Sequence, residues 1–223
     1  MWIPLESNPE VMTKFLHTLG VPKKWSIIDV YGLDPDLLAI VPRPVLAVIL
    51  LYPTKTEKIK EEKEEPKDSK NDTPDSVYYI KQYIHNACGT IALLHSVANN
   101  LDVIKLEEGS LKQFLDETMG LSSAERGKKL ENAQGIASIH KEFALEGQTG
   151  APDEDVEVYH HFVAFVHKDG NLYELDGRDA GPINHGSTTP DDLLIDAARV
   201  CKEYMKRDPS EVRFTVVALA ASE

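Results

Sequence analysis

The stretch from Gln82 to Ala98 reads QYIHNACGTIALLHSVA, and it brings a cysteine to the start of an apolar helical run. The residues from Thr90 onward are mostly apolar, so we expect a helix in the centre of the fold. Cys88 stands at the start of this helix, where the positive end of the helix dipole favours a thiolate and lowers the pKa of the thiol. Gly89 beside it lets another backbone approach closely. The stretch therefore predicts a nucleophilic thiolate at the amino end of a central helix.

The other groups that thiolate chemistry requires are also present in the chain. Gln82 lies six positions before Cys88 and can supply an amide donor to an oxyanion. His161 lies on a strand-like run, and Asp176 ends another. A nucleophile, a base and an orienting carboxylate are thus all available, in the order Cys, His, Asp.

The residue pattern leaves alternatives open at three of these positions. Cys88 is either a catalytic thiolate or a small buried core residue, and its place beside Gly89 at the helix start weakens the second interpretation. His160 and His161 are adjacent on a strand, so they point to opposite faces, and the apolar residues around them do not show which one meets the cysteine. Asp176 precedes Gly177, and Asp-Gly is also a common turn sequence. Cys201 lies on the apolar face of its helix, and we interpret it as a small core residue.

Composition excludes several classes of protein. The chain has 223 residues, 42% of them hydrophobic and 27% charged, which predicts a single globular domain over residues 1–223. Its formal net charge of −13 predicts repulsion from nucleic acids and acidic membrane surfaces, and attraction to a basic partner. No cluster of Cys and His has the spacing of a zinc site, and no phosphate-binding glycine motif is present. We therefore expect no metal, no other cofactor and no nucleotide.

The same sequence predicts where the protein is found. There are only two cysteines, so a disulfide framework does not hold the fold. The first residues lack the pattern of a signal peptide, and no run approaches the ~20 apolar residues of a membrane span. We expect a monomer in the cytoplasm or the nucleus, with reduced thiols.

Hydrophobic periodicity and turn residues predict the elements around the central helix. Helices are mixed with hairpin-linked strands, and the strand at 44–52 is a near-continuous apolar run that should be buried on both faces. This mixture favours an α+β fold with a mainly antiparallel sheet. The expected helices cover residues 9–19, 34–40, 110–119, 122–131, 133–145 and 189–207, and the expected strands cover 25–31, 44–52, 162–167, 172–176 and 212–220.

Two segments are expected to lie outside this regular structure. Residues 55–75 are nearly all charged or polar, which predicts a mobile surface insertion. Residues 146–157 show no periodicity and contain several glycines, acids and a proline, which predicts a loop.

Motifs along nearly the whole chain resemble those of the ubiquitin C-terminal hydrolases, a family of papain-like cysteine proteases. The length fits the short members that lack a C-terminal regulatory extension. The matching segments are WIPLESNPE at 2–10, DVYG at 29–32, VPRP at 41–44, Gln82 with NACGT at 86–90, EGQ at 146–148, His161-Phe162, YELDGR at 173–178, PINHG at 182–186 and RDPSEVRF at 207–214.

The resemblance implies a role for each candidate residue. Cys88 is the implied nucleophile, His161 the general base and Asp176 the group that orients the imidazole. Gln82 is the implied oxyanion donor, beside the backbone N–H of Cys88. The family places its base directly before an aromatic residue, here Phe162, and this resolves the choice between the two histidines. The implied fold is a six-stranded antiparallel sheet between helical layers, with a knotted backbone.

The resemblance also implies a substrate. A member of this family removes small adducts from the C-terminal glycine of ubiquitin through a thioester, and ubiquitin's tail carries arginines that suit an acidic surface. Glu6, Glu10 and Asp29 lie in family-like segments and are candidate contacts for that tail. The loop at 146–157 resembles the family's crossover loop at the active-site mouth, which limits the size of leaving groups. Two alternatives are a protease for a related modifier such as Nedd8, and a weakly catalytic ubiquitin-binding module.

Overall fold

The fold is built on one antiparallel sheet whose strands differ in length. The structure is a computed structural model that describes residues 2–54, 74–147 and 159–222. Six strands lie in the order β1-β6-β2-β3-β4-β5, and every neighbouring pair is antiparallel. This confirms the α+β class and the six-stranded antiparallel sheet. The strands are β1 Trp25–Asp29, β2 Val45–Pro53, β3 His160–Lys168, β4 Asn171–Leu175, β5 Ile183–Ser187 and β6 Thr215–Ala221.

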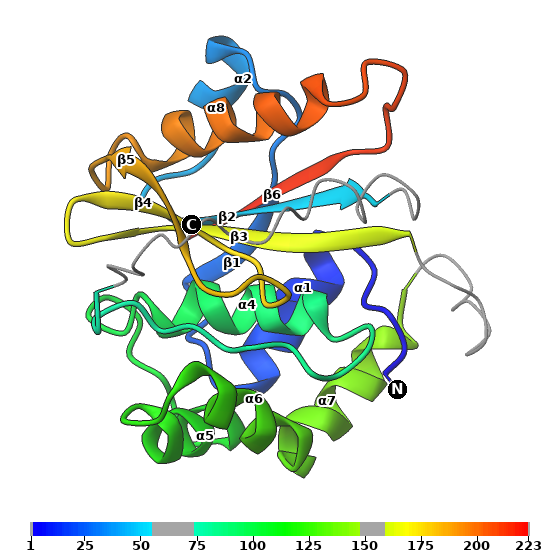
Figure 1. The fold of residues 1–223 in the computed structure, drawn as a ribbon, viewed down its shortest axis with the longest axis vertical. Coiled ribbons are helices and arrows are strands. Elements are labelled where there is room, and N and C mark those ends of the chain that lie inside the picture. Colours follow the sequence, from blue (N-terminus) through cyan, green and yellow to red (C-terminus); the bar gives the residue numbers. More distant parts are fainter. Residues whose placement is uncertain (1, 55–73, 148–158, 223) are drawn as a thin grey trace.

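Helices cover both faces of the sheet and so form three layers (Figure 1). One face carries α2 (Pro35–Ala39) and α8 (Leu193–Lys206). The other face carries the remaining described helices, with α4 packed closest to the strands. These are α1 Pro9–Thr18, α4 Cys88–Ala98, α5 Ser110–Thr118, α6 Ser123–Glu131 and α7 Gln134–Ala144.

Most expected elements are confirmed, and the differences lie at the polar ends of strands. The final strand begins at Thr215 rather than at residue 212, and the first ends at Asp29. Periodicity did not predict the edge strand β5, because its sequence INHGS does not alternate and has a single large apolar residue, Ile183, which is exposed. Four of its five positions are exposed. It pairs only with β4, so backbone hydrogen bonds rather than side-chain burial define it.

Local capping explains where two of the helices begin. Asn8 accepts hydrogen bonds from the backbone N–H groups of Glu10 (3.0 Å) and Val11 (3.3 Å), which fixes the start of α1. Ser122 and Glu125 form a reciprocal capping box at the start of α6. These caps satisfy amide groups that the helices leave unpaired.

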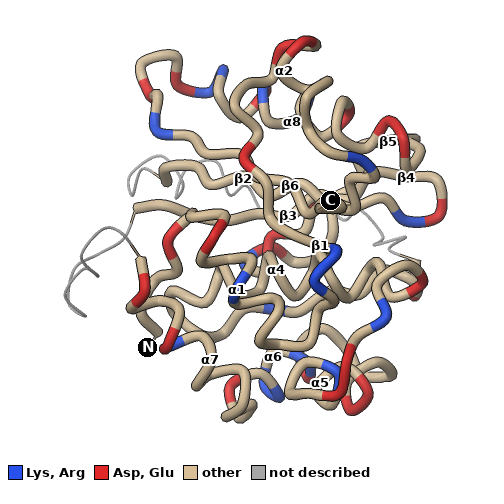
Figure 2. The backbone as a smooth tube through the Cα atoms, turned by 180° about the vertical axis from the view of Figure 1, so that it is seen from behind, with Lys and Arg blue, Asp and Glu red and all other residues tan. Residues whose placement is uncertain are grey.

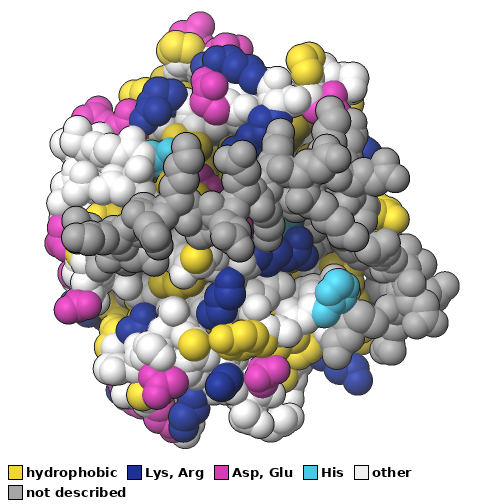
Figure 3. All heavy atoms as spheres, in the orientation of Figure 1, with side chains coloured by type: hydrophobic (Ala, Val, Ile, Leu, Met, Phe, Trp, Pro, Cys, Tyr) yellow, Lys and Arg dark blue, Asp and Glu magenta, His cyan; other side chains and the backbone are white. Residues whose placement is uncertain are grey.

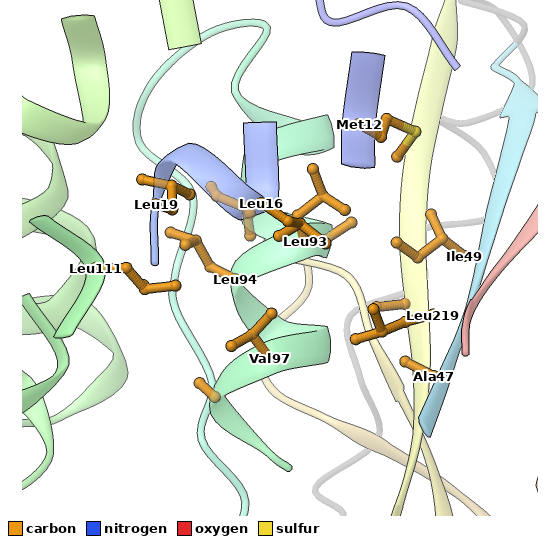
Figure 4. Packing of buried hydrophobic residues seen from close by; sticks show 14 of the residues in the cluster. Met12, Leu16, Leu19, Ala47, Ile49, Leu93, Leu94, Val97, Leu111 and Leu219 are labelled. Carbon is orange, nitrogen blue, oxygen red and sulfur yellow. The ribbon is translucent and has the colours of Figure 1, made fainter. Parts of the chain in front are cut away.

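The central helix α4 has no exposed face. All eleven of its residues are buried, and the first six residues of β2 are buried as well. Figure 4 shows Leu93 pointing toward Ile49 of β2 and Leu94 toward Leu111 of α5. Helix α4 therefore lies between the sheet and the outer helices, which confirms its expected central position.

Polar side chains at the carboxyl end of α4 hold the segment that leads to Gln82. Asn99 accepts from the backbone N–H of Tyr78 (2.8 Å) and donates to its carbonyl (2.9 Å). His95 Nε2 accepts from the backbone N–H of Ile80 at 2.9 Å, and burial lowers the pKa of His95 to about 4, so this ring is neutral. This segment has no regular secondary structure, and side chains of α4 take the place of a neighbouring strand.

The two irregular segments fall mainly on residues that the structure does not describe. The expected insertion at 55–75 and the expected crossover loop at 146–157 include residues 55–73 and 148–158, which lie outside the described residues. Both expectations stay predictions, as does the knotted course of the backbone. Among the described residues, no helix has the length and apolar character needed to cross a membrane.

Replacing Asn99 by alanine should lower the free energy of unfolding by about 3 kcal/mol, because two buried backbone groups of Tyr78 would lose their partner. Asn132→Ala is the matched control. Each asparagine side chain donates to the carbonyl four residues earlier, that of His95 for Asn99 and that of Lys128 for Asn132, but Asn132 lies at the surface. It should cost less than about 0.5 kcal/mol. Urea unfolding of both variants at one pH measures the difference. Equal losses would show that Asn99 does not hold this segment.

Candidate active site

Cys88 is the first residue of α4, and its side chain is buried with a residue exposure of 7%. The helix start is tightly enclosed. A Cβ atom placed on Gly89 would lie 3.1 Å from Leu5 and 3.2 Å from the ring of Phe162. Asn86 just before it has a φ of 63°, a left-handed conformation that is uncommon for a residue other than glycine. The chain therefore turns sharply into α4 and presents Cys88 between the amino-terminal segment and β3.

His161 and Asp176 form a buried hydrogen-bonded pair on neighbouring strands. His161 lies near the start of β3, and Asp176 directly follows β4. His161 Nε2 donates to Asp176 Oδ1 at 2.7 Å, and the backbone N–H of Arg178 donates to the same oxygen at 2.8 Å. Burial would raise the pKa of the Asp176 carboxyl, but the hydrogen bond and charge of His161 outweigh it and lower this pKa. Asp176 is therefore ionised and holds the imidazole in one orientation.

The other ring nitrogen of His161, Nδ1, is the one that can interact with Cys88. Since Nε2 is bonded to Asp176, the interaction between the Cys88 and His161 side chains involves Nδ1. Nδ1 is buried, and no hydrogen bond of ordinary geometry joins it to the described residues. Both the hydrogen-bonding capacity and the charge of His161 nevertheless lower the pKa of the Cys88 thiol.

The pKa values of Cys88 and His161 are shifted in opposite directions, as expected when each charge stabilises the other. Burial raises the pKa of the Cys88 thiol, but the hydrogen bonding and charge of His161, helped by the Phe162 backbone and the charge of Arg178, bring it below the usual value. Burial lowers the pKa of His161, but Asp176 and Cys88 raise it to about 9. Each group therefore favours the charged form of the other, and the charged form of Cys88 is the thiolate that nucleophilic catalysis by cysteine requires.

The two adjacent histidines have different surroundings, as the strand periodicity predicts. His161 is 1% exposed and reaches Asp176, whereas His160 is half-buried and belongs to the opposite face. The geometry joins His161, and not His160, to the carboxylate. Cys201 is buried on α8, on the far side of the sheet, and burial raises the pKa of its thiol to about 12, as expected for a core residue.

Gln82 lies beside the loop that follows Asp176. Its backbone N–H donates to the carbonyl of Gly177 at 2.8 Å, and its side-chain Nε2 donates to the carbonyl of Ile84 at 2.9 Å. Its Oε1 is buried without a partner among the described residues. The amide nitrogen carries two hydrogens, so one is still available to an oxyanion.

The three candidate acids lie on the amino-terminal segment, α1 and β1. Glu6 packs against Gly147, and Asp29 is half-buried at the end of β1. Glu10 is exposed and pairs with Lys14 at 3.0 Å. Lys14 is also 3.8 Å from Glu146, so the sequence-based interpretation missed a cation within this acidic group. Figure 2 shows several acidic positions near the amino terminus, whereas on the face in Figure 3 basic side chains are interspersed with acidic ones.

Two features of the site were missed by the sequence interpretation. The charge of Arg178 lowers the pKa of Cys88, and its backbone N–H bonds the Asp176 carboxylate. The signal was its position two residues after an aspartate, the spacing of an Asx-turn. The hydroxyl of Tyr79 bonds the carbonyl of Asp176 at 2.5 Å, and no spacing in the sequence predicts this contact. Within the described residues, no group of three or more His, Cys, Asp or Glu side chains could hold a metal ion.

His161→Gln should move the pH midpoint of Cys88 alkylation upward, because the imidazolium would be lost while the burial that raises the thiol pKa remains. In the wild type the reactive thiolate should persist well below the pH of an ordinary thiol. His160→Gln is the control and should leave the midpoint unchanged. The measurement is the rate of iodoacetamide alkylation across pH. An unchanged midpoint in His161→Gln would separate His161 from the reactivity of Cys88.

Comparison with known proteins agrees with this geometry. A model of the family described as ubiquitin carboxyl-terminal hydrolase, family 1, matches residues 2–206. A ubiquitin carboxyl-terminal hydrolase of Drosophila melanogaster is 51% identical, over 100% of this chain and 98% of its own length. The human isozyme L1 is 44% identical, over 97% of this chain and 96% of its own.

A solved structure shares the fold. The catalytic domain of UCH37 from Trichinella spiralis, bound to ubiquitin vinyl methyl ester, matches with a TM-score of 0.80 and 29% identity, and the match covers 100% of this chain and 96% of that one. The family match, the close relatives and the shared fold agree, and the chain belongs to the ubiquitin carboxyl-terminal hydrolases, a family of thiol peptidases.

Proposed function

We propose that this chain removes small adducts from the C-terminal glycine of ubiquitin, with Cys88 as nucleophile, His161 as general base and Asp176 as the orienting carboxylate. The observation that carries the proposal is the buried imidazole of His161, held at 2.7 Å by Asp176 and paired in charge with the Cys88 thiolate. Family membership supports the substrate, and so does the Trichinella relative that was solved with ubiquitin vinyl methyl ester bound.

The first half of the reaction forms a thioester. The Cys88 thiolate attacks the carbonyl carbon of the terminal glycine, and the carbonyl electrons move to oxygen. His161 gives its proton to the departing amine or thiol as the oxyanion collapses, so the scissile bond breaks and the acyl group stays on Sγ. Asp176 keeps the imidazole aligned and stabilises its charge.

The second half releases ubiquitin. Neutral His161 takes a proton from water, the resulting hydroxide attacks the thioester carbonyl, and the C–S bond breaks to release the thiolate and a carboxylic acid, which loses its proton to solvent. The thiolate and the imidazolium are thereby restored. The oxyanion of both steps is bound by the backbone N–H of Cys88, which helix geometry leaves unpaired, and by the second amide hydrogen of Gln82.

Cys88→Ala should abolish hydrolysis of a ubiquitin C-terminal amide and labelling by a ubiquitin C-terminal electrophile, since only the thiolate can form the acyl-enzyme. Cys201→Ala is the control and should keep turnover, because that thiol is buried in the opposite core. Turnover is followed by fluorescence release. Residual turnover of Cys88→Ala above about one-thousandth of the wild type would exclude it as the nucleophile.

The same assay separates the remaining alternatives. A matched Nedd8 amide shows whether the enzyme prefers the related modifier. Binding of ubiquitin by the wild type without any turnover would mean that the chain is a ubiquitin-binding module. Support for catalysis comes from the aligned His161–Asp176 pair, which a binding module would not require.

We also propose that Glu6, Glu10 and Asp29 contact the arginines of ubiquitin's tail. Binding should then weaken with added salt, because such contacts are screened over about 8 Å at physiological ionic strength. Glu10→Lys should flatten the salt dependence of Kd measured by calorimetry. Glu131→Lys, an exposed acid on α6, is the control and should change it little. A wild-type Kd that does not change with salt would contradict the charged contacts.

The charge and thiol content support a setting for this activity. A net charge of −13 supports a protein that binds neither nucleic acid nor an acidic membrane surface. Two unpaired thiols on opposite faces of the sheet support a reducing compartment, and we propose a monomer in the cytoplasm or nucleus.

A further inference from the structure

His140 of α7 links two parts of the molecule that are distant in sequence. Its Nδ1 lies 2.7 Å from the hydroxyl of Thr90, in the first turn of α4, and its Nε2 lies 2.7 Å from the carbonyl of Ile3. Thr90 is fully buried, and His140 is 1% exposed. The imidazole therefore bridges the amino-terminal segment and the helix that carries Cys88.

The position of each proton in this bridge follows from the partners. The carbonyl of Ile3 can only accept, so Nε2 carries a hydrogen and donates it. Burial lowers the pKa of His140 to about 4, so the ring is neutral and its Nδ1 is an acceptor. The hydroxyl of Thr90 consequently donates to Nδ1. Each hydrogen bond has one fixed direction, and the bridge is fully satisfied.

The amino-terminal segment that His140 holds lies against the nucleophile. Figure 1 shows the amino end of the chain beside α7. The ring of Trp2 packs on the ring of His140 with centroids 4.3 Å apart, and the backbone N–H of Trp2 donates to the carbonyl of His85 at 3.1 Å. Further along, Leu5 contacts Gly89, the neighbour of Cys88. The segment thus touches both sides of the turn that presents the thiolate.

We propose that Thr90 and His140 are positioning residues, which lock the amino-terminal segment onto the first turn of α4 and thereby align Cys88 with His161. Thr90 lies two residues after Cys88, so a shift of this turn displaces Sγ relative to Nδ1 of His161. Because Nδ1 makes no hydrogen bond of ordinary geometry to the described residues, the hydrogen-bonding and charge effects of His161 on the Cys88 thiol depend on this spacing. A change in the hydrogen bonds of His140 to Thr90 and Ile3 should therefore change the pKa and the reactivity of Cys88. The inference rests on the proposed function only where it is tested by turnover of a ubiquitin C-terminal amide.

The first experiment removes one hydrogen bond without changing shape. Thr90→Val keeps the side-chain volume and loses the hydroxyl, whereas Thr90→Ser keeps the hydroxyl. Thr90→Val should lower kcat for a ubiquitin C-terminal amide about tenfold, with KM within about twofold, and Thr90→Ser should retain most of the activity. Equal kcat values in wild type and Thr90→Val would overturn the proposal.

The matched control is Thr118→Val. Thr118 is also fully buried, and its hydroxyl is also hydrogen-bonded, to Tyr78 and to the carbonyl of Phe114, but it lies at the end of α5. This variant should lose stability in urea unfolding and keep its kcat. If it lowers kcat as much as Thr90→Val does, the effect of Thr90 is general destabilisation, and the positioning role is wrong.

A second readout does not involve ubiquitin. In Thr90→Val the pH midpoint of Cys88 alkylation by iodoacetamide should move upward, because the thiolate loses part of its interaction with His161. Thr90→Ser and Thr118→Val should leave it unchanged. An unchanged midpoint in Thr90→Val would refute the coupling. This result is independent of turnover, so an enzyme that fails to cleave the ubiquitin amide would contradict the proposed function alone.

A double-mutant cycle tests the bridge as a unit. His140→Gln alone should lower kcat about as much as Thr90→Val, and the double variant should lower it little further, because both changes break the same link. Independent, multiplicative losses would contradict a shared link.

Discussion

The complete burial of α4 is the constraint on which the rest of the structure depends. A helix with no exposed face cannot use water to satisfy its polar side chains, so each must find a partner inside the protein. His95 and Asn99 do so by binding the irregular segment before Gln82, and Thr90 by binding His140. The same burial fixes the start of the helix, and with it the position of Cys88, the proposed nucleophile.

The same requirement for a partner applies to the charged forms of Cys88 and His161. A thiolate and an imidazolium are costly to remove from water, and each persists only because the other is present with further hydrogen bonds. Asp176 supplies one to His161, and the backbone of Arg178 in turn bonds Asp176. The loop after β4 therefore contributes to the reactivity of a cysteine that lies far from it in the sequence. The neighbouring strands β3 and β4 bring these parts together.

Local patterns were sufficient to predict the central helix, its cysteine and most strands, because burial and period are properties of short segments. They did not distinguish His160 from His161, since apolar residues flank both faces of β3 and only the family resemblance separated them. They missed β5, which is defined by pairing with β4 and buries little. The contact of Tyr79 with Asp176 depends on how distant segments meet, which periodicity does not report, whereas that of Arg178 is a local Asx-turn contact that the interpretation overlooked. Residues 148–158 lie outside the described residues, so the loop there stays a prediction.

The placement of the two cysteines on opposite faces of the sheet has a consequence for oxidative stress. Peroxide attacks thiolates, so Cys88 is the side chain that would form a sulfenic acid, while the protonated and buried Cys201 would be spared. The sheet separates the two sulfurs, so Cys201 cannot act as a resolving thiol. With no other cysteine in these 223 residues, recovery of the sulfenic acid would depend on a thiol from outside, such as glutathione, that can reach Cys88.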